Sequence, residues 1–262
     1  MSISRVAAKA VFAIGDLVTS RPPGPRLLIY HQVGTDHGHQ MEVDEAHFAS
    51  QLTWLQDNCE LTDLETAVSR WEEPGSEKVV VLTFDDGYRD VYTTAFPMLR
   101  SREVPFVLYL STGLVGSASG GAAFAGDPLS WDEVTEMVGT GLVTVGAHTH
   151  SHPDMREISA SQAAEELDKS DGIIEDRVGV RPRHFAYPYG FWSASADGLV
   201  RDRYETAVLG GKPRPSARLD PHLIHRYPVQ KSDGDLFFRA RVRRGLGLEE
   251  AVRRRIKGYR GP

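Results

Sequence analysis

The stretch VVVLTFDDGYRD, residues 79–90, joins an unbroken apolar run to two adjacent carboxylates, Asp85 and Asp86. An apolar run of this kind, without alternating polar residues, is typical of a strand that is buried on both faces. Successive side chains of a strand point to opposite faces, so the two carboxylates should leave the strand end in different directions. Like charges repel in a low dielectric. Either the Asp-Asp-Gly sequence therefore forms a turn in which Asp86 caps the next helix, or a cation holds both groups ionised.

Similar apolar runs recur along the chain and alternate with helical patterns. The runs occupy residues 26–31, 105–110, 142–147, 184–187, 205–209 and 223–229, and the helical patterns occupy residues 45–58, 90–100, 131–138, 161–177 and 194–203. Short β runs separated by helices predict a parallel sheet with both faces covered. The chain has 262 residues, of which 40% are hydrophobic and 25% charged. We therefore expect one α/β domain, either a barrel or a doubly wound sheet.

The two ends of the chain differ in pattern from the domain expected over residues 25–262. Residues 1–24 form an amphipathic segment whose apolar stretch is too short for a secretory h-region or a membrane span. Residues 239–262 carry eight Arg and one Lys against two Glu, which predicts a solvated basic helix. Aromatic residues are nearly absent there, which argues against nucleic acid as a partner. We expect residues 1–24 to pack on the protein's own domain, with shallow membrane attachment as the alternative. The protein should be cytoplasmic or membrane-peripheral, with any membrane contact made by these two terminal segments.

A second polar cluster follows another predicted strand, in GAHTHSHPDM at residues 146–155. His148, His150 and His152 lie at the carboxyl end of that strand, the edge at which parallel α/β folds gather their chemistry. A lone His is usually a surface or core residue, whereas a cluster at a strand end is a common source of transition-metal ligands. Because Pro153 disfavours helical geometry at His152, a tight turn should carry these side chains.

The two clusters together explain the paired carboxylates. A divalent cation bound by His148 and His152 would take one Asp as its third ligand and keep the other ionised through its field. Two His and one carboxylate leave an open coordination position, which is the arrangement of a catalytic site. Zinc suits these donors best, and cobalt, nickel or iron would also fit. The second carboxylate would then be a base.

Three motifs resemble those of the polysaccharide deacetylases, the family 4 carbohydrate esterases that include nodulation-type chitooligosaccharide deacetylases. They are TFDDG at residues 83–87, HTHSHP at residues 148–153 and FAYPYG at residues 185–190, in the order of the family. The joint occurrence of three motifs is far more specific than any one of them. The resemblance covers most of the chain. It implies a single-domain α/β fold, a distorted (β/α)7 barrel, and metal-dependent removal of N-acetyl groups from an N-acetylhexosamine glycan or glycan precursor.

The resemblance also implies a role for each residue that matches a motif. Asp86, His148 and His152 match the metal ligands of the family. Asp85 matches the catalytic base, which accepts a proton from the attacking water. Tyr189 matches the residue whose backbone N–H helps to bind the oxyanion.

One departure from the family pattern concerns the Arg that orients the base. Many members carry this Arg in the third motif, where the present chain has Ala186. Arg226, in HRYPV, is the candidate replacement. The alternative for Arg226, given equal weight, is a surface salt bridge.

A second departure concerns the general acid that protonates the leaving amine. The C-terminal region has no clear copy of the final motif of the family, whereas LLIYHQV places His31 at the end of the opening strand. This arrangement is similar to that of a circularly permuted subgroup of exopolysaccharide deacetylases, in which the opening strand supplies the histidine. His225 is the rival candidate.

Three other functions fit parts of the pattern. A non-haem iron oxygenase also uses two His and one carboxylate, but it does not need Asp85 and usually lies on a β-sandwich. A protein that binds glycans without turnover would be compatible with Ala186 in place of the Arg. A deacylase of a small or lipid-linked aminosugar would use the same residues on a different substrate.

Overall fold

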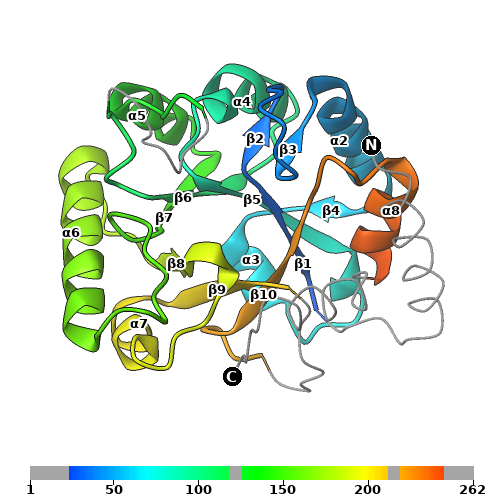
Figure 1. The fold of residues 1–262 in the computed structure, drawn as a ribbon. Coiled ribbons are helices and arrows are strands. Elements are labelled where there is room, and N and C mark those ends of the chain that lie inside the picture. Colours follow the sequence, from blue (N-terminus) through cyan, green and yellow to red (C-terminus); the bar gives the residue numbers. More distant parts are fainter. Residues whose placement is uncertain (1–23, 118–125, 212–218, 245–262) are drawn as a thin grey trace.

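Seven parallel strands close into a barrel in the computed structural model, and helices surround it (Figure 1). The model describes residues 24–117, 126–211 and 219–244. The distorted (β/α)7 barrel is therefore the correct fold of the two that the strand pattern allowed. Residues 1–23 and 245–262 lie outside the described residues, so the membrane contact expected from the terminal segments stays a prediction.

The barrel closes because its first strand pairs with two others. β1 lies parallel to β10 on one side and to β5 on the other. Two short strands pair with each other in a separate sheet, and a third short strand pairs with the start of β5. The barrel strands are β1 (Arg26–Tyr30), β5 (Val79–Asp86), β6 (Phe106–Leu110), β7 (Val143–Ala147), β8 (His184–Ala186), β9 (Thr206–Gly210) and β10 (Ile224–Pro228), and the short strands are β2 (Gln32–Val33), β3 (Glu42–Val43) and β4 (Glu60–Leu61).

The strands are continuous apolar runs because both of their faces are covered. All eight residues of β5 are buried. Alternate side chains of the strands form an inner cluster that includes Leu27, Val81, Val107 and Ile224, while their neighbours pack outward against the helices. The inner cluster makes the lower barrel a packed core, so polar chemistry is confined to the strand ends.

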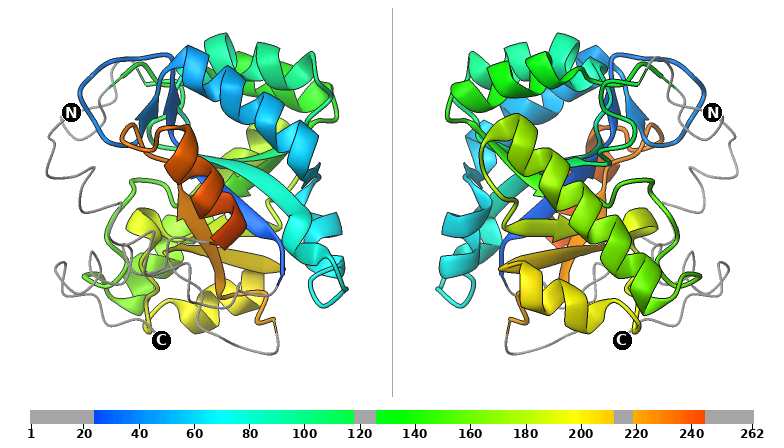
Figure 2. Two further views of the ribbon diagram at one scale, coloured as in Figure 1. Left: turned by 90° about the vertical axis from the view of Figure 1, so that its right-hand side faces the viewer. Right: turned by 90° about the vertical axis from the view of Figure 1, so that its left-hand side faces the viewer.

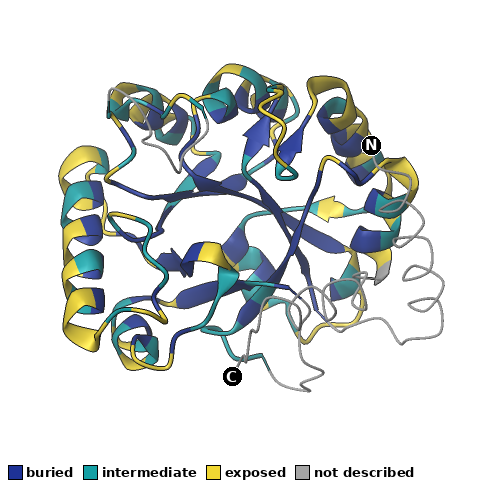
Figure 3. Cartoon of the chain, viewed as in Figure 1, coloured by how far each residue is buried: buried dark blue, intermediate teal, exposed yellow. Residues whose placement is uncertain are grey.

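The helices form a layer around the barrel, with their outer faces exposed (Figures 2 and 3). Several begin where the sequence provides a cap. Asp44, Ser130 and Ser159 each accept a hydrogen bond from a backbone N–H of the first turn. No helix in the described part of the chain is long and apolar enough to cross a bilayer. The helices are α2 (Glu45–Asn58), α3 (Leu64–Ser69), α4 (Phe96–Arg100), α5 (Trp131–Gly139), α6 (Ala160–Val178), α7 (Asp197–Arg203) and α8 (Asp235–Arg244).

The helix predicted over residues 90–100 is not a single regular helix. It begins with a π-helical turn, Val91–Ala95, and becomes α-helical only at α4. Pro97 lies at the start of α4. Because Pro has no N–H and its ring clashes with the carbonyl four residues earlier, a regular α-helix through this position is disfavoured.

The prediction of a solvated basic helix over residues 239–262, of which the structure describes residues 239–244, does not hold at Arg241. The side chain of Arg241 on α8 is buried, and its guanidinium binds the buried carboxylate of Asp233 through two hydrogen bonds of 3.0 Å. Arg239 and Arg243 of the same helix stay exposed beside the ring of Trp54. The described part of α8 is thus anchored to the domain by the side chain of Arg241.

Candidate active site at the carboxyl end of the barrel

The two carboxylates at the end of β5 point in different directions, as the strand pattern predicts. Asp85 meets Arg226 from β10, whereas Asp86 faces His148 and His152. Both carboxylates are buried, and Asp86 caps no helix in the described residues. The interpretation of Asp86 as a helix cap is therefore wrong.

Asp86, His148 and His152 converge on one point. The Oδ1 atom of Asp86 lies 3.4 Å from Nε2 of His148 and 3.3 Å from Nε2 of His152. The other ring nitrogen of His148, Nδ1, donates to the carbonyl oxygen of Ala186 at 2.7 Å. That bond fixes the ring and leaves Nε2 facing Asp86, as in the outer coordination shell of many histidine metal ligands.

These three side chains fit a divalent metal. In a tetrahedral zinc site with bonds of 2.0–2.1 Å, the ligand atoms lie roughly 3.3 Å apart, close to the spacings of this cluster. Oδ1 of Asp86 is buried and has no hydrogen-bond partner among the described residues. Within those residues, this is also the only group of three His, Cys, Asp or Glu side chains whose donor atoms come close enough to hold an ion.

The charges at the cluster keep Asp86 and His152 in the forms that bind a metal, whereas Asp86 and Asp85 raise the pKa of His148 against the effect of its burial. Burial alone would raise the pKa of Asp86, but the nearby imidazoles of His148, His31 and His152 hold that pKa well below its usual range. Burial and the nearby His148 lower the pKa of His152 to about 4. At neutral pH the protein thus offers an ionised carboxylate and a neutral imidazole, which are the forms that coordinate a metal.

Asp85 is paired with Arg226 inside the barrel. The two terminal nitrogens of the guanidinium donate to the two carboxylate oxygens at 2.6 and 2.7 Å, and one of them also donates to Oγ1 of Thr83. Burial alone would raise the pKa of Asp85, but Arg226 and then His148 hold it below its ordinary value. Arg226 is completely buried, so the alternative of a surface salt bridge is wrong.

A glycine on β7 makes room for the aromatic ring beside which the buried guanidinium lies. Arg226 lies over the ring of Tyr109, 5.0 Å from its centroid. A Cβ atom at Gly146 would lie 2.4 Å from that ring, so only glycine allows Tyr109 its position. Ala186, where the family often has Arg, belongs to the same inner cluster as Tyr109. The interior accommodates one Arg, supplied by β10.

The two candidates for the general acid lie on different faces of the barrel wall. Nε2 of His31, directly after β1, lies 3.9 Å from Oδ2 of Asp86. His225 neighbours Arg226 on β10, and because Arg226 faces inward, His225 faces the opposite side, as Tyr227 in the outer core does. The structure therefore brings His31, and not His225, to the carboxylate cluster.

Tyr189 borders the cluster from the turn after β8. Its ring packs edge to face against His152, with the centroids 4.6 Å apart, and 58% of the residue is exposed. Its backbone is left-handed, with φ of 59°. The turn thus places the backbone of residue 189 and an exposed aromatic ring beside a metal-ligand candidate.

Backbone strain is concentrated at this site. Five residues other than glycine have positive φ in the described chain, and four of them are Asp86, Thr149, His152 and Tyr189. Positive φ is uncommon for such residues, and strain of this kind clusters at functional sites. The surrounding hydrogen bonds must therefore hold these residues in place.

Two sets of supporting residues were not found from the sequence. Residues 111–113, after β6, bond to the backbone of the histidine turn. They follow a strand end, so the argument that located the histidines could have found them. Glu166 on α6 bonds to the same turn from the other side, and a single Glu among the charged residues of a helix gives no sequence signal.

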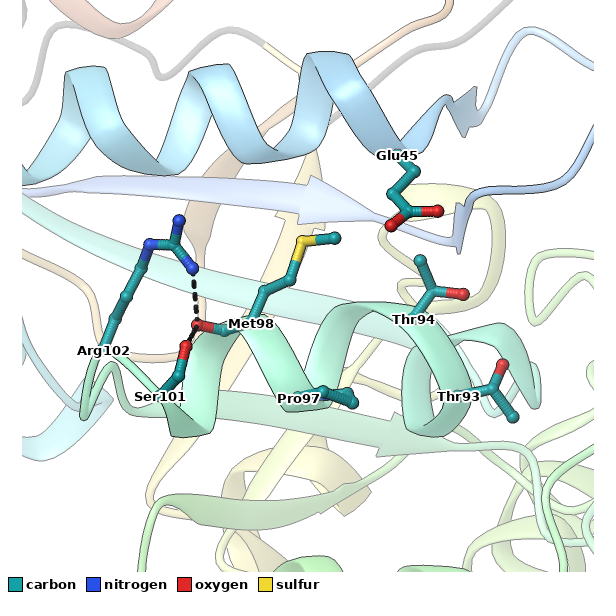
Figure 4. A pocket seen from close by; sticks show the side chains of 7 residues that line it. All are labelled: Glu45, Thr93, Thr94, Pro97, Met98, Ser101 and Arg102. Carbon is teal, nitrogen blue, oxygen red and sulfur yellow. Dashed lines mark hydrogen bonds between the residues drawn. The ribbon is translucent and has the colours of Figure 1, made fainter.

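A pocket of about 350 Å³ lies away from this cluster, between the start of α2 and the helical segment around α4 (Figure 4). Arg102 is the basic residue of its lining. The guanidinium donates a hydrogen bond to the carbonyl oxygen of Met98 and thereby caps the helix that it follows. None of the residues at the carboxylate cluster lines this pocket. The lining residues are Glu45, Thr93, Thr94, Pro97, Met98, Ser101 and Arg102.

Comparisons with known proteins agree with the fold described above. The family model described as polysaccharide deacetylase matches residues 72–204, just over half of the chain. The Bacillus subtilis protein YxkH, named as a polysaccharide deacetylase, is 26% identical over 215 residues, which are 80% of this chain and 73% of that protein. The structure of IcaB from Ammonifex degensii superposes with a TM-score of 0.69 at 27% identity and covers 86% of this chain and 98% of that one.

A third relative is longer than the present chain. The poly-beta-1,6-N-acetyl-D-glucosamine N-deacetylase of Staphylococcus aureus is 30% identical over 161 residues, which are 56% of this chain and 53% of the relative. The alignment therefore spans about half the length of this curated relative.

Proposed function

The chain belongs to the polysaccharide deacetylase family, and we propose that it is a metal-dependent hydrolase that removes N-acetyl groups from an N-acetylhexosamine glycan or glycan precursor. The observation that supports this most strongly is the Asp86, His148 and His152 cluster next to an Asp85 held by Arg226. A non-haem iron oxygenase would have no use for that second, Arg-bound carboxylate. We propose zinc as the resident ion because two imidazoles and one carboxylate suit it best.

The proposed chemistry assigns one task to each residue. When bound, the metal lowers the pKa of water and polarises the acetamide carbonyl. Asp85 accepts the proton of the attacking water, and Arg226 keeps its carboxylate ionised and fixed. The backbone N–H of Tyr189 donates to the oxyanion as it forms. His31 gives a proton to the leaving nitrogen.

The Arg226 contact favours an enzyme over a protein that only binds glycans. A binding protein has no need to keep a buried carboxylate ionised, and burying two charges is costly unless they are paired with good geometry. Here the pair is bidentate and fully buried. Orientation of the base is thus provided by a residue outside the third motif.

A substrate panel tests the proposed function and separates its alternatives. We expect zinc-loaded protein to release acetate and free amine from at least one N-acetylated sugar, in a series from N-acetylglucosamine through oligomers to a polymer and a lipid-linked aminosugar. Dialysis against a chelator should abolish the release, and added zinc should restore it. Binding of a glycan without any release would instead identify a binding protein.

Removing the Arg226 charge should move the acid limb of the pH–rate profile to higher pH. Arg226 lowers the pKa of Asp85, so in Arg226→Met that pKa rises and the base stays protonated to higher pH. By the same linkage, ionised Asp85 stabilises the native state above its unfolded pKa, and this contribution is lost as the pH falls through the folded value. The measurement is kcat/KM against pH with zinc present. Arg226→Lys, which keeps the charge, is the control, and an unchanged limb in Arg226→Met would contradict the role.

Replacing His31 by Ala should lower the rate of amide hydrolysis roughly a hundredfold or more, because an amine leaves poorly without a proton. Zinc content should stay near that of the wild type. The ester 4-nitrophenyl acetate has a leaving group that needs no proton. The variant should therefore cleave this ester almost as fast as the wild type. His225→Ala is the matched control and should keep its rate on both substrates. The reverse result, with His225→Ala impaired and His31→Ala active, would place the acid on β10.

A further inference from the structure

The turn that carries the histidines is strained between its two candidate ligands. It runs from His148 at the end of β7 to His152, and Thr149 and His152 have φ of 65° and 57°. Left-handed backbone at residues other than glycine persists only where the surroundings hold it. The position of the His152 imidazole therefore depends on whatever fixes this turn.

Two groups hold the turn, and they bind different atoms. The segment after β6 binds its carbonyl oxygens: Oγ of Ser111 donates to the carbonyl of residue 148, and the backbone N–H groups of residues 112 and 113 donate to those of residues 149 and 150. Glu166, on α6, binds the N–H side. Its Oε2 accepts from the N–H groups of His150 and Ser151 at 2.9 and 2.7 Å, and its Oε1 accepts from Oγ of Ser151 at 2.6 Å.

The two histidines depend on this carboxylate to different degrees. His148 is anchored on its own account, because it closes a buried strand end and its Nδ1 donates to the carbonyl of Ala186. For His152, the backbone N–H bonds only within the turn, to Oγ1 of Thr149, and the ring lies between those of His148 and Tyr189. Loss of the Glu166 bonds should therefore displace His152 far more than His148.

We propose that Glu166 is a positioning residue for the metal site, which acts through the backbone of residues 150–151 to hold His152 in place as a ligand. The inference rests on the metal site of the proposed function. It goes beyond that function because the hydrogen bonds of Glu166 reach residues 150 and 151 of the turn and not the three proposed ligands. A carboxylate that accepts several backbone N–H groups makes strong, charge-assisted hydrogen bonds, which suits it to fixing a strained turn.

Zinc affinity of the metal-free protein tests the proposal without any assay of activity. Zinc is titrated into apo protein in competition with a chromophoric chelator. Glu166→Ala should bind zinc roughly 10- to 100-fold more weakly than the wild type, the usual effect of removing a group that orients a ligand. Glu165→Ala, an exposed neighbour on the same helix, is the matched control and should bind like the wild type. Glu166→Gln should recover part of the affinity, because its amide oxygen can still accept.

A double-mutant cycle separates positioning from general support of the fold. If Glu166 acts through His152, the variant Glu166→Ala/His152→Ala should bind zinc no more weakly than His152→Ala alone. Losses that add in the double variant, or an affinity of Glu166→Ala equal to that of the wild type, would overturn the inference. A wild-type protein that binds no zinc would overturn the proposed metal site itself and the inference with it.

Discussion

Replacing Asp86 by Asn should give a folded protein that holds no zinc and releases acetate roughly a thousandfold more slowly than the wild type. Oδ1 of Asp86 is the atom on which both Nε2 atoms converge, and an amide removes the only negative charge among the three proposed ligands. The metal supplies several kcal/mol of charge stabilisation in hydrolases of this type. Its loss should therefore lower kcat by roughly a thousandfold.

The measurement is metal content of the purified variant together with acetate release before and after zinc is added. Wild-type protein, stripped with a chelator and reloaded in parallel, shows that the procedure itself leaves the site competent. A variant that retains one equivalent of zinc would remove Asp86 from the ligand set.

Replacing Asp85 by Asn should have the opposite signature, with normal zinc content and a rate lower by roughly 10²- to 10⁴-fold. An amide cannot accept the proton of the attacking water, and general base catalysis usually contributes a factor of this size. The change removes no proposed ligand, because Asp85 faces Arg226 and not the histidines. Zinc analysis and single-turnover kinetics on the same preparation measure both effects.

This second variant also leaves the Arg226 guanidinium buried without its counter-charge, which typically destabilises a protein by about 3–5 kcal/mol. The double variant Asp85→Asn/Arg226→Met removes both charges and should regain thermal stability without regaining rate. Recovery of rate in the double variant would show that Asp85 acts through stability alone. Loss of zinc from Asp85→Asn, with zinc retained by Asp86→Asn, would exchange the roles of the two carboxylates.

The strands could be predicted because burial on both faces leaves a direct trace in the sequence. A run such as residues 79–82 is apolar throughout, and the strand-like runs of the sequence overlap all seven barrel strands. β2, β3 and β4 have two residues each, and a pattern of period two cannot be recognised in two residues. The π-helical turn before α4 precedes Pro97 directly, and the helical periodicity of residues 90–100 did not reveal it.

Parts of the candidate site could also be predicted, because parallel strands bring their carboxyl ends to one edge of the sheet. That rule places Asp86 beside His148 although 62 residues separate them. The partner of Asp85 was harder to find, because Arg226 lies 141 residues away. Side chains alternate along β10, and only this alternation decides that Arg226 points to the interior while His225 points away from it. Glu166 acts through backbone atoms, which any sequence presents, so its role depends wholly on the position of α6.

The buried pair of Asp85 and Arg226 shows that a closed barrel lets a cation reach a carboxylate from a strand that is distant in the sequence. β1 lies between β5 and β10 and pairs with both, so Arg226 reaches Asp85 across the lumen and not along a shared edge. Every strand of a barrel contributes side chains to the same interior. A cationic side chain can therefore enter that interior from any strand if the residues that face it are small enough. In this chain the small residues are Gly146 and Ala186. A third motif that lacks its Arg therefore need not indicate a lost activity, because another strand can supply the cation.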